Sequence, residues 1–128
     1  MEKKIPQYFA EEIASRFGLN EYTSAVNLEC RFPSTPIMIS PQFLNAPEYL
    51  QKCSEELDQS ATHIFFLTKL SNLSRNTFKS FLKDSKKCRG VYLIPKLIFD
   101  GYESPAPFPL CLLELTADDN NETLISVW

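Results

Sequence analysis

Two apolar runs, separated by a polar and basic segment, constrain the fold of this chain more than any other feature. The first run covers residues 62–70 and the second covers residues 91–99. Each is apolar on both faces, which is typical of a strand buried in a sheet that helices cover. Parallel strands need a long crossover, so residues 62–99 predict a central strand–helix–strand (βαβ) unit. Pro95 cannot donate to a ladder, which places the second strand at an edge or a bulge.

The helix of this unit is expected from about Ser74 to about Lys87. Ser74 is the best N-cap candidate, because a serine hydroxyl can accept a hydrogen bond from the first helical turn. Gly90 ends the helical pattern. The apolar face of the helix consists of Phe78, Phe81 and Leu82.

The first half of the chain predicts two more helices and two short strands. Residues 7–17 show helical spacing of apolar side chains, and Gly18 suits the position after the helix. Residues 22–32 alternate between apolar and polar, which indicates a strand with one wet face. Residues 36–40 are a candidate hairpin partner for that strand. A further helix is expected from about residue 46 to 59, starting next to Pro47.

The last third predicts an extended loop followed by a hairpin. Residues 101–109 are rich in proline, which excludes a helix. Residues 110–116 and 123–128 read as strands, joined by an acidic, Asn-rich turn at 117–122. A length of 128 residues suits one domain. We therefore predict a single compact α/β (or α+β) domain over 1–128, with a mixed sheet of five to six strands and about three helices.

The cysteines and the apolar runs predict a cytosolic protein. No apolar run approaches ~18 residues, and the first residues lack the apolar core of a signal peptide, so we expect no membrane association. The cysteines lie far apart, which favours unlinked thiols over a metal site. Cys88 lies among Lys86, Lys87 and Arg89, so a reactive thiol with a lowered pKa is the alternative there. The four cysteines are Cys30, Cys53, Cys88 and Cys111.

His63 is the only histidine, and it stands at the start of the first buried run. Ligands of open α/β sheets bind at the carboxyl ends of the strands, so His63 lies at the wrong end for a ligand site. It also shares a strand face with Phe65 and Leu67. We expect a structural, hydrogen-bonded histidine, with a general base as the alternative.

The carboxyl end of the same strand is a better place for a ligand. Lys69, Ser74 and Arg75 gather there with other polar residues, next to the expected helix N-terminus, where anions are favoured. There is no Gly-rich phosphate loop in this turn. An anion site and an ordinary helix cap with solvated charges therefore remain as alternatives.

Charge is distributed unevenly along the chain. Between Phe65 and Gly90 there are seven basic residues and one acidic residue, a local charge of +6 in a chain of net charge −3. Arg75, Lys79 and Lys83 follow at helical spacing and predict a basic stripe beside the apolar face, and Lys86 and Lys87 extend it. The basic residues of the segment are Lys69, Arg75, Lys79, Lys83, Lys86, Lys87 and Arg89. The C-terminal third is acidic through Asp100, Glu103, Glu114, Asp118, Asp119 and Glu122.

The proline-rich loop is a second candidate surface. Tyr102 and Phe108 flank its prolines and would present a stiff, partly apolar face, which suits recognition because little entropy is lost on binding. A loop packed back onto the core through Phe108 is the alternative.

These features predict a small protein-binding module, such as an adaptor, inhibitor or assembly subunit, that meets an acidic partner surface. The expected binding residues are Lys69, Ser74, Arg75, Lys79, Lys83, Lys86, Lys87, Tyr102 and Phe108. Nucleic-acid, nucleotide or phosphate binding at residues 69–75 and the basic helix is the alternative. A small enzyme that uses His63 or Cys88 is the third hypothesis. No catalytic, metal or cofactor motif occurs, so we expect no metal and no cofactor.

Overall fold

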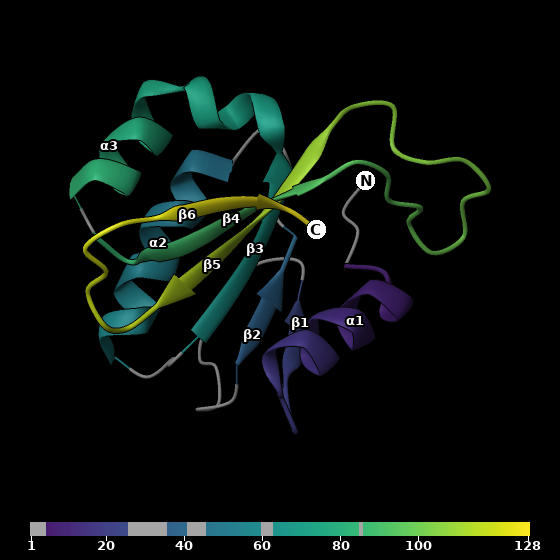
Figure 1. The fold of residues 1–128 in the computed structure, drawn as a ribbon, viewed down its shortest axis with the longest axis horizontal. Helices are drawn as coiled ribbons and strands as arrows, with labels where there is room; N and C mark the ends of the chain where they lie inside the picture. The colour runs from purple at the N-terminus through teal and green to yellow at the C-terminus, as the bar shows by residue number, and fades with distance from the viewer. Residues whose placement is uncertain (1–4, 26–35, 41–45, 60–62, 85) are drawn as a thin grey trace.

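The computed structural model describes residues 5–25, 36–40, 46–59, 63–84 and 86–128. Within them the chain forms three α-helices, a short 3₁₀ helix and one sheet of six strands (Figure 1). The elements are α1 (Gln7–Phe17), β1 (Thr23–Ala25), β2 (Ile37–Ile39), α2 (Ala46–Gln59), β3 (His63–Lys69), the 3₁₀ helix η2 (Leu70–Ser74), α3 (Asn76–Asp84), β4 (Cys88–Ile94), β5 (Leu110–Thr116) and β6 (Leu124–Val127). The predicted α/β class with a mixed sheet is confirmed.

The sheet has the strand order β1-β2-β3-β5-β4-β6. The first three strands in this order run parallel to one another, and β6 runs parallel to β4. β5 is antiparallel to both of its neighbours, β3 and β4. The predicted unit of strand, helix and strand is therefore present as β3–α3–β4, with its two strands pointing the same way. They are not neighbours, because β5 lies between them.

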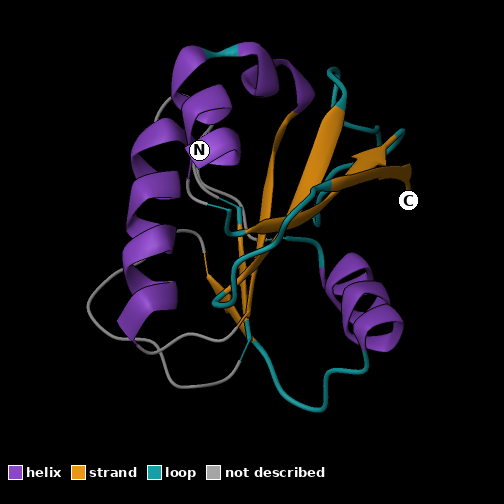
Figure 2. Cartoon of the chain, turned by 60° about the vertical axis from the view of Figure 1, so that its left-hand side comes forward, coloured by secondary structure: helices purple, strands orange, loops and turns teal. Residues whose placement is uncertain are grey.

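Helices cover both faces of the sheet, which gives three layers (Figure 2). On one face α2 and α3 contribute Leu50, Cys53 and Phe78 to a core cluster that includes Phe66 and Leu113 of the sheet. On the other face α1 contributes Phe9 and Ile13 to a second cluster, which includes Phe65 and Leu112. Successive residues of a strand point to opposite faces, so the uninterrupted apolar run of β3 supplies both clusters.

The two predicted hairpins are wrong. β1 and β2 pair in parallel, so residues 36–40 are not a hairpin partner of the preceding strand. The remainder of that predicted strand, residues 26–32, lies outside the described residues. β6 pairs with β4 and not with β5, because β3 and β4 already occupy both edges of β5. The acidic turn therefore connects β5 to β6 across the end of β4, which lies between them in the sheet.

The boundaries of α3 and β4 also differ from the prediction. α3 begins at Asn76, and Ser74 belongs to η2 and does not cap it. α3 ends at Asp84, and Lys86 adopts a left-handed conformation with φ of 57°, which turns the chain towards β4. β4 ends at Ile94, directly before Pro95, and it is an interior strand rather than an edge. Its bulge lies at the other end, between Cys88 and Gly90.

Candidate functional site

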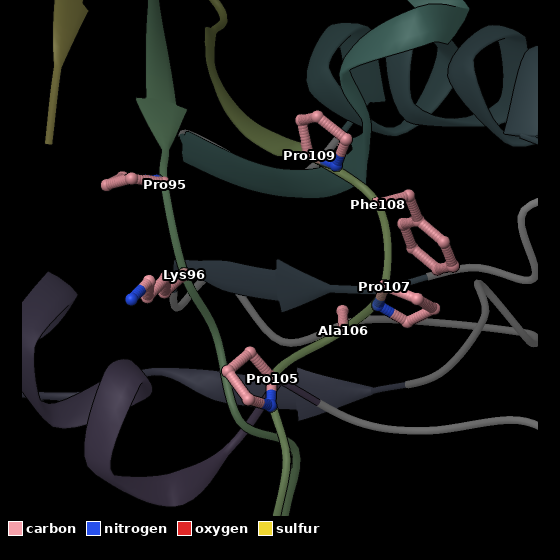
Figure 3. Close-up of a pocket in the computed structure, with 7 residues that line it drawn as sticks. All are labelled: Pro95, Lys96, Pro105, Ala106, Pro107, Phe108 and Pro109. Carbon is pink, nitrogen blue, oxygen red and sulfur yellow. The ribbon is translucent and has the colours of Figure 1, made fainter.

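The loop between β4 and β5 folds back on itself and forms a groove. The backbone N–H of Ala106 donates to the carbonyl of Leu97 at 2.9 Å, and the N–H of Tyr102 donates to the carbonyl of Phe99 at 3.1 Å. The groove has a volume of about 300 Å³. Figure 3 shows its two walls, one on the branch that leaves β4 and one on the branch that returns to β5. This proline groove is lined by Pro95, Lys96, Pro105, Ala106, Pro107, Phe108 and Pro109.

The proline groove is attached to the carboxyl end of β3. The Nζ atom of Lys69 lies 4.4 Å from the centroid of the Phe108 ring, a cation–π arrangement. The backbone N–H of Leu70 donates to the carbonyl of Pro109 at 3.0 Å. Phe108 is half-buried and packs against the core cluster under α1, as the packed-back alternative predicts. Tyr102 is 48% exposed and lies outside the groove lining.

The basic stripe lies on the solvent side of α3. Arg75 immediately precedes the helix, and Lys79 and Lys83 follow along it; all three side chains are exposed. Phe78 and Phe81, on the neighbouring face of the helix, are buried. The predicted amphipathic pattern of this helix is therefore correct.

Lys86 and Lys87 differ in their surroundings. Lys86 is exposed, in the left-handed turn after α3. The Nζ atom of Lys87 donates to the carbonyl of Ala117 at 2.7 Å and lies 3.6 Å from the Asp119 Oδ1 atom. Lys87 therefore connects the segment after α3 to the acidic turn. Its charge is paired with Asp119, whereas the side chains of the stripe extend into solvent.

Two polar groups of the predicted anion site at residues 69–75 are engaged within the turn itself. The Ser74 hydroxyl donates to the carbonyl of Ser71 at 2.8 Å, inside η2. The Asn72 side chain is buried and its Nδ2 atom donates to the Thr68 Oγ1 atom at 2.8 Å. These two polar groups serve the turn itself, so the loop offers fewer anion ligands than its sequence indicates.

A buried polar network lies on the face of the sheet that α1 covers. Glu114, in the middle of β5, is only 3% exposed. Its Oε2 atom lies 2.9 Å from the Nε2 atom of His63 on β3, and its Oε1 atom accepts a hydrogen bond from the Tyr92 hydroxyl on β4 at 3.0 Å. A carboxylate can only accept, so both neighbours donate to it. The predicted hydrogen bond of His63 is thereby confirmed.

The network shifts the pKa values of two of its members. Burial alone would raise the pKa of Glu114, but the hydrogen bonds from His63 and Tyr92, with the charges of His63 and Arg89, outweigh it and hold that pKa below its usual value. Burial, with the hydrogen bond to Glu114 and its negative charge, raises the pKa of Tyr92 to about 12. Glu114 is therefore an anion and Tyr92 a neutral donor at neutral pH.

Gly90 makes room for this network. It lies opposite Glu114 in the ladder between β4 and β5. A Cβ atom at this position would lie 3.0 Å from the Tyr92 hydroxyl oxygen and 3.1 Å from its Cε2 atom. The Tyr92 ring folds back over the glycine and so reaches the carboxylate. A side chain at this position would have to push the Tyr92 ring aside.

Aromatic rings and one arginine cover the network. Phe17 of α1 packs edge-on against His63 and Tyr92, with ring centroids 6.3 and 5.7 Å apart. Trp128 packs edge-on against Tyr92 at 5.7 Å. The Arg16 guanidinium lies 4.3 Å over the Trp128 ring. These groups cover much of the network on the solvent side, and His63 and Tyr92 keep a partial exposure.

Glu114 differs from the other acidic residues of the C-terminal third, because its side chain is buried within β5. It is the only charged residue within the run Leu110-Cys-Leu-Leu-Glu-Leu-Thr116. A lone carboxylate inside a buried strand needs a partner, and the single histidine at the start of another buried strand is the natural candidate. That pairing was available from the sequence.

The reactive-thiol hypothesis has no support from the surroundings of Cys88. Its Sγ atom donates to the carbonyl of Gly90 at 3.4 Å, and the side chain is buried. Burial raises the pKa of Cys88 to about 12, and that of Cys111 also to about 12. Cys53, Cys88 and Cys111 are unlinked; Cys30 lies outside the described residues. Among the residues that the structure describes, no group of His, Cys, Asp and Glu could hold a metal ion.

No helix in the described part of the chain is long and apolar enough to cross a bilayer. Searches against protein-family models, curated proteins and solved structures gave no match for the chain.

Proposed function

We propose that this chain is a protein-binding module that recognises an acidic, partly apolar segment of another protein. Its docking surface consists of the proline groove, Lys69 and the basic stripe of Arg75, Lys79 and Lys83. The observation that carries the proposal is the contact between Lys69 and Phe108, supported by the hydrogen bond from Leu70 to Pro109. It joins two features that lie far apart in the sequence into one surface.

The shape of the groove supports binding of an extended segment. Prolines fix their own backbone angle φ, so the walls lose little conformational entropy when a partner binds. The backbone hydrogen bonds from Ala106 and Tyr102 hold the two branches of the loop together. The groove also lies at the carboxyl ends of β3 and β4, the end at which open α/β sheets usually bind ligands.

The charges support an acidic partner. Lys96 lines the groove, Lys69 lies beside it, and the stripe continues along α3. Complementary charge steers association and fixes orientation. A protein is favoured over a nucleic acid, because the Phe108 ring at this surface already contacts Lys69 and the core, which leaves it poorly placed to stack on a base.

Charge-reversal variants test the stripe. Lys79→Glu and Lys52→Glu both reverse an exposed lysine, one on the docking surface and one on α2, so the second is a matched control. Each tagged variant is used for affinity capture from native lysate, with nuclease treatment and with added salt, and bound proteins are quantified by mass spectrometry. We expect Lys79→Glu to reduce capture of a defined partner by up to about tenfold, since the loss of one surface ion pair costs about 0–1 kcal/mol and the new like-charge repulsion adds a similar amount.

Pro107→Glu tests the groove independently of the stripe. Pro107 is exposed, so the change adds bulk and negative charge to the groove with little effect on the core. We expect loss of the same partner that Lys79→Glu loses, with thermal unfolding unchanged for both. Retention of that partner by both variants contradicts the proposal. Capture that disappears on nuclease treatment supports nucleic-acid binding instead, which should weaken steeply with salt.

A further inference from the structure

β6 is an edge strand that no part of the described chain covers. All four of its residues are exposed, with Leu124 at 65%, Ile125 at 70% and Val127 at 65%. One side of β6 pairs with β4, and the strand order ends there (Figure 1). An edge strand usually carries a lysine, a proline or a bulge that prevents pairing with another chain. β6 contains no such residue, and the bulge of this region lies in β4.

The hydrogen-bond pattern determines which groups of β6 face outward. The backbone N–H of Trp128 donates to the carbonyl of Leu93 on β4 at 3.0 Å. Along a strand, successive residues direct their backbone groups to opposite sides. The groups of Leu124 and Ser126 therefore point towards β4, as those of Trp128 do, and those of Ile125 and Val127 point away from the sheet. The backbone groups of Ile125 and Val127 can therefore form hydrogen bonds with a further strand at this edge.

We infer that β6 pairs antiparallel with the β6 strand of a second copy of this chain, across a two-fold axis centred on Ser126. In this register Ile125 of one copy lies opposite Val127 of the other, and each pair exchanges two hydrogen bonds through its outward groups. The register uses the same surface on both copies, as a two-fold interface requires. One continuous sheet then runs through both copies.

The side chains agree with this register. β6 residues alternate between the faces of the sheet, with Leu124 beside Gly90 and Ile125 beside Val91. On the face of α2 and α3, the dimer places Ile125 against Val127 twice, and such β-branched cross-strand pairs stabilise sheets. On the face of α1, it places Leu124 against Trp128 twice. A second copy therefore covers the exposed apolar side chains of β6 with apolar side chains.

Two double variants test both the dimer and its register. Ile125→Lys with Val127→Lys places like charges directly opposite each other in the inferred register. Ile125→Lys with Val127→Glu places opposite charges there, at the same two positions. If Ile125 instead faced Ile125, both variants would bring two lysines together. All the changed side chains are exposed, and circular dichroism checks that each variant is folded.

Sedimentation velocity over a range of concentrations measures the outcome. We expect the wild-type chain to dimerise, the Lys/Lys variant to have a dissociation constant raised by at least about tenfold, and the Lys/Glu variant to stay within about threefold of wild type. Amide hydrogen exchange should show protection of Ile125 and Val127 in the dimer. A wild-type chain that is monomeric at all concentrations overturns the inference, and so do two double variants with equal dissociation constants. Neither result bears on the docking surface, which lies elsewhere on the chain.

Discussion

The Glu114 network gives a prediction that can be worked from the structure. Replacing Glu114 with Gln keeps the shape of the side chain and an acceptor for Tyr92, but removes the negative charge that His63 faces. Glu114 is 3% exposed, so water cannot compensate for the loss. A hydrogen bond to a charged group contributes about 1.5–3 kcal/mol, and the neutral glutamine weakens the two bonds that Glu114 accepts, so we expect a loss of about 2–3 kcal/mol.

Tyr92→Phe removes one hydrogen bond from the same network. A hydrogen bond to a charged group contributes about 1.5–3 kcal/mol, and the partial exposure of Tyr92 reduces the expected loss to about 1–2 kcal/mol. The double variant Tyr92→Phe with Glu114→Gln should cost less than the sum of the two single changes. A coupling of about 1 kcal/mol is expected, since the charge strengthens the bond that Tyr92 donates.

The pH dependence of the effect has a defined sign. The pKa of Glu114 is lower in the folded chain than the ordinary value of about 4.3. Its charge therefore contributes stability that is fully present above the unfolded pKa and is lost as the pH falls through the folded pKa. The titratable and charged groups around the Glu114 carboxylate are His63 from β3 and Tyr92 and Arg89 from β4. Arg16 from α1 lies over the Tyr92 ring.

Urea unfolding followed by fluorescence measures these free energies. Trp128 is the only tryptophan, and it packs on Tyr92, so its emission reports on this region. The difference in the free energy of unfolding between wild type and Glu114→Gln should have its full size at pH 6 and should be smaller at pH 3. The reasoning is refuted if the two chains differ by less than ~0.5 kcal/mol at pH 6, a threshold below the usual worth of one hydrogen bond, or if the gap is as large at pH 3.

Three other changes test the surroundings of the network. Gly90→Ala should destabilise the fold by about 1–2 kcal/mol in urea unfolding, since the new methyl group displaces the Tyr92 ring; no loss would mean that the ring moves freely. Trp128→Ala should cost about 2–4 kcal/mol and reduce the hydrogen-exchange protection of β6, because the ring packs on Tyr92 and on α1. Cys88 and Cys111 should resist iodoacetamide at pH 8 until the chain is unfolded, because their pKa values are raised to about 12; rapid alkylation in the native state, read by peptide mass spectrometry, would contradict this.

The local patterns of the sequence predicted local structure well. The apolar spacing of residues 7–17 and the position of Gly18 located α1 correctly. The run from residue 62 to 70 located β3 to within one residue at each end. The spacing of Arg75, Lys79 and Lys83 correctly placed a basic stripe outside the buried face of α3. Each of these follows from neighbours in the sequence, where periodicity fixes the geometry.

Strand pairing could not be read in the same way. The apolar pattern of β5 shows that it is buried on both faces, but not that it lies between β3 and β4. That placement depends on side chains about fifty residues apart, such as the His63 and Glu114 pair. The joining of the proline groove to Lys69 is equally non-local. Several members of the proposed docking surface, such as Lys69, the basic stripe and Phe108, could therefore be predicted, while their arrangement could not.

The position of β5 has a consequence for the order in which the chain folds. The strand β5 near the centre of the sheet is supplied by residues 110–116, after both of its neighbours, β3 and β4, in the chain. Until that segment is available, β3 and β4 each lack the partner that fills the space between them, and their buried side chains cannot be enclosed. Folding during synthesis cannot complete the core from the N-terminal end. Residues 110–116 must be available before the core can close, and until then the buried faces of β3 and β4 are exposed to aggregation.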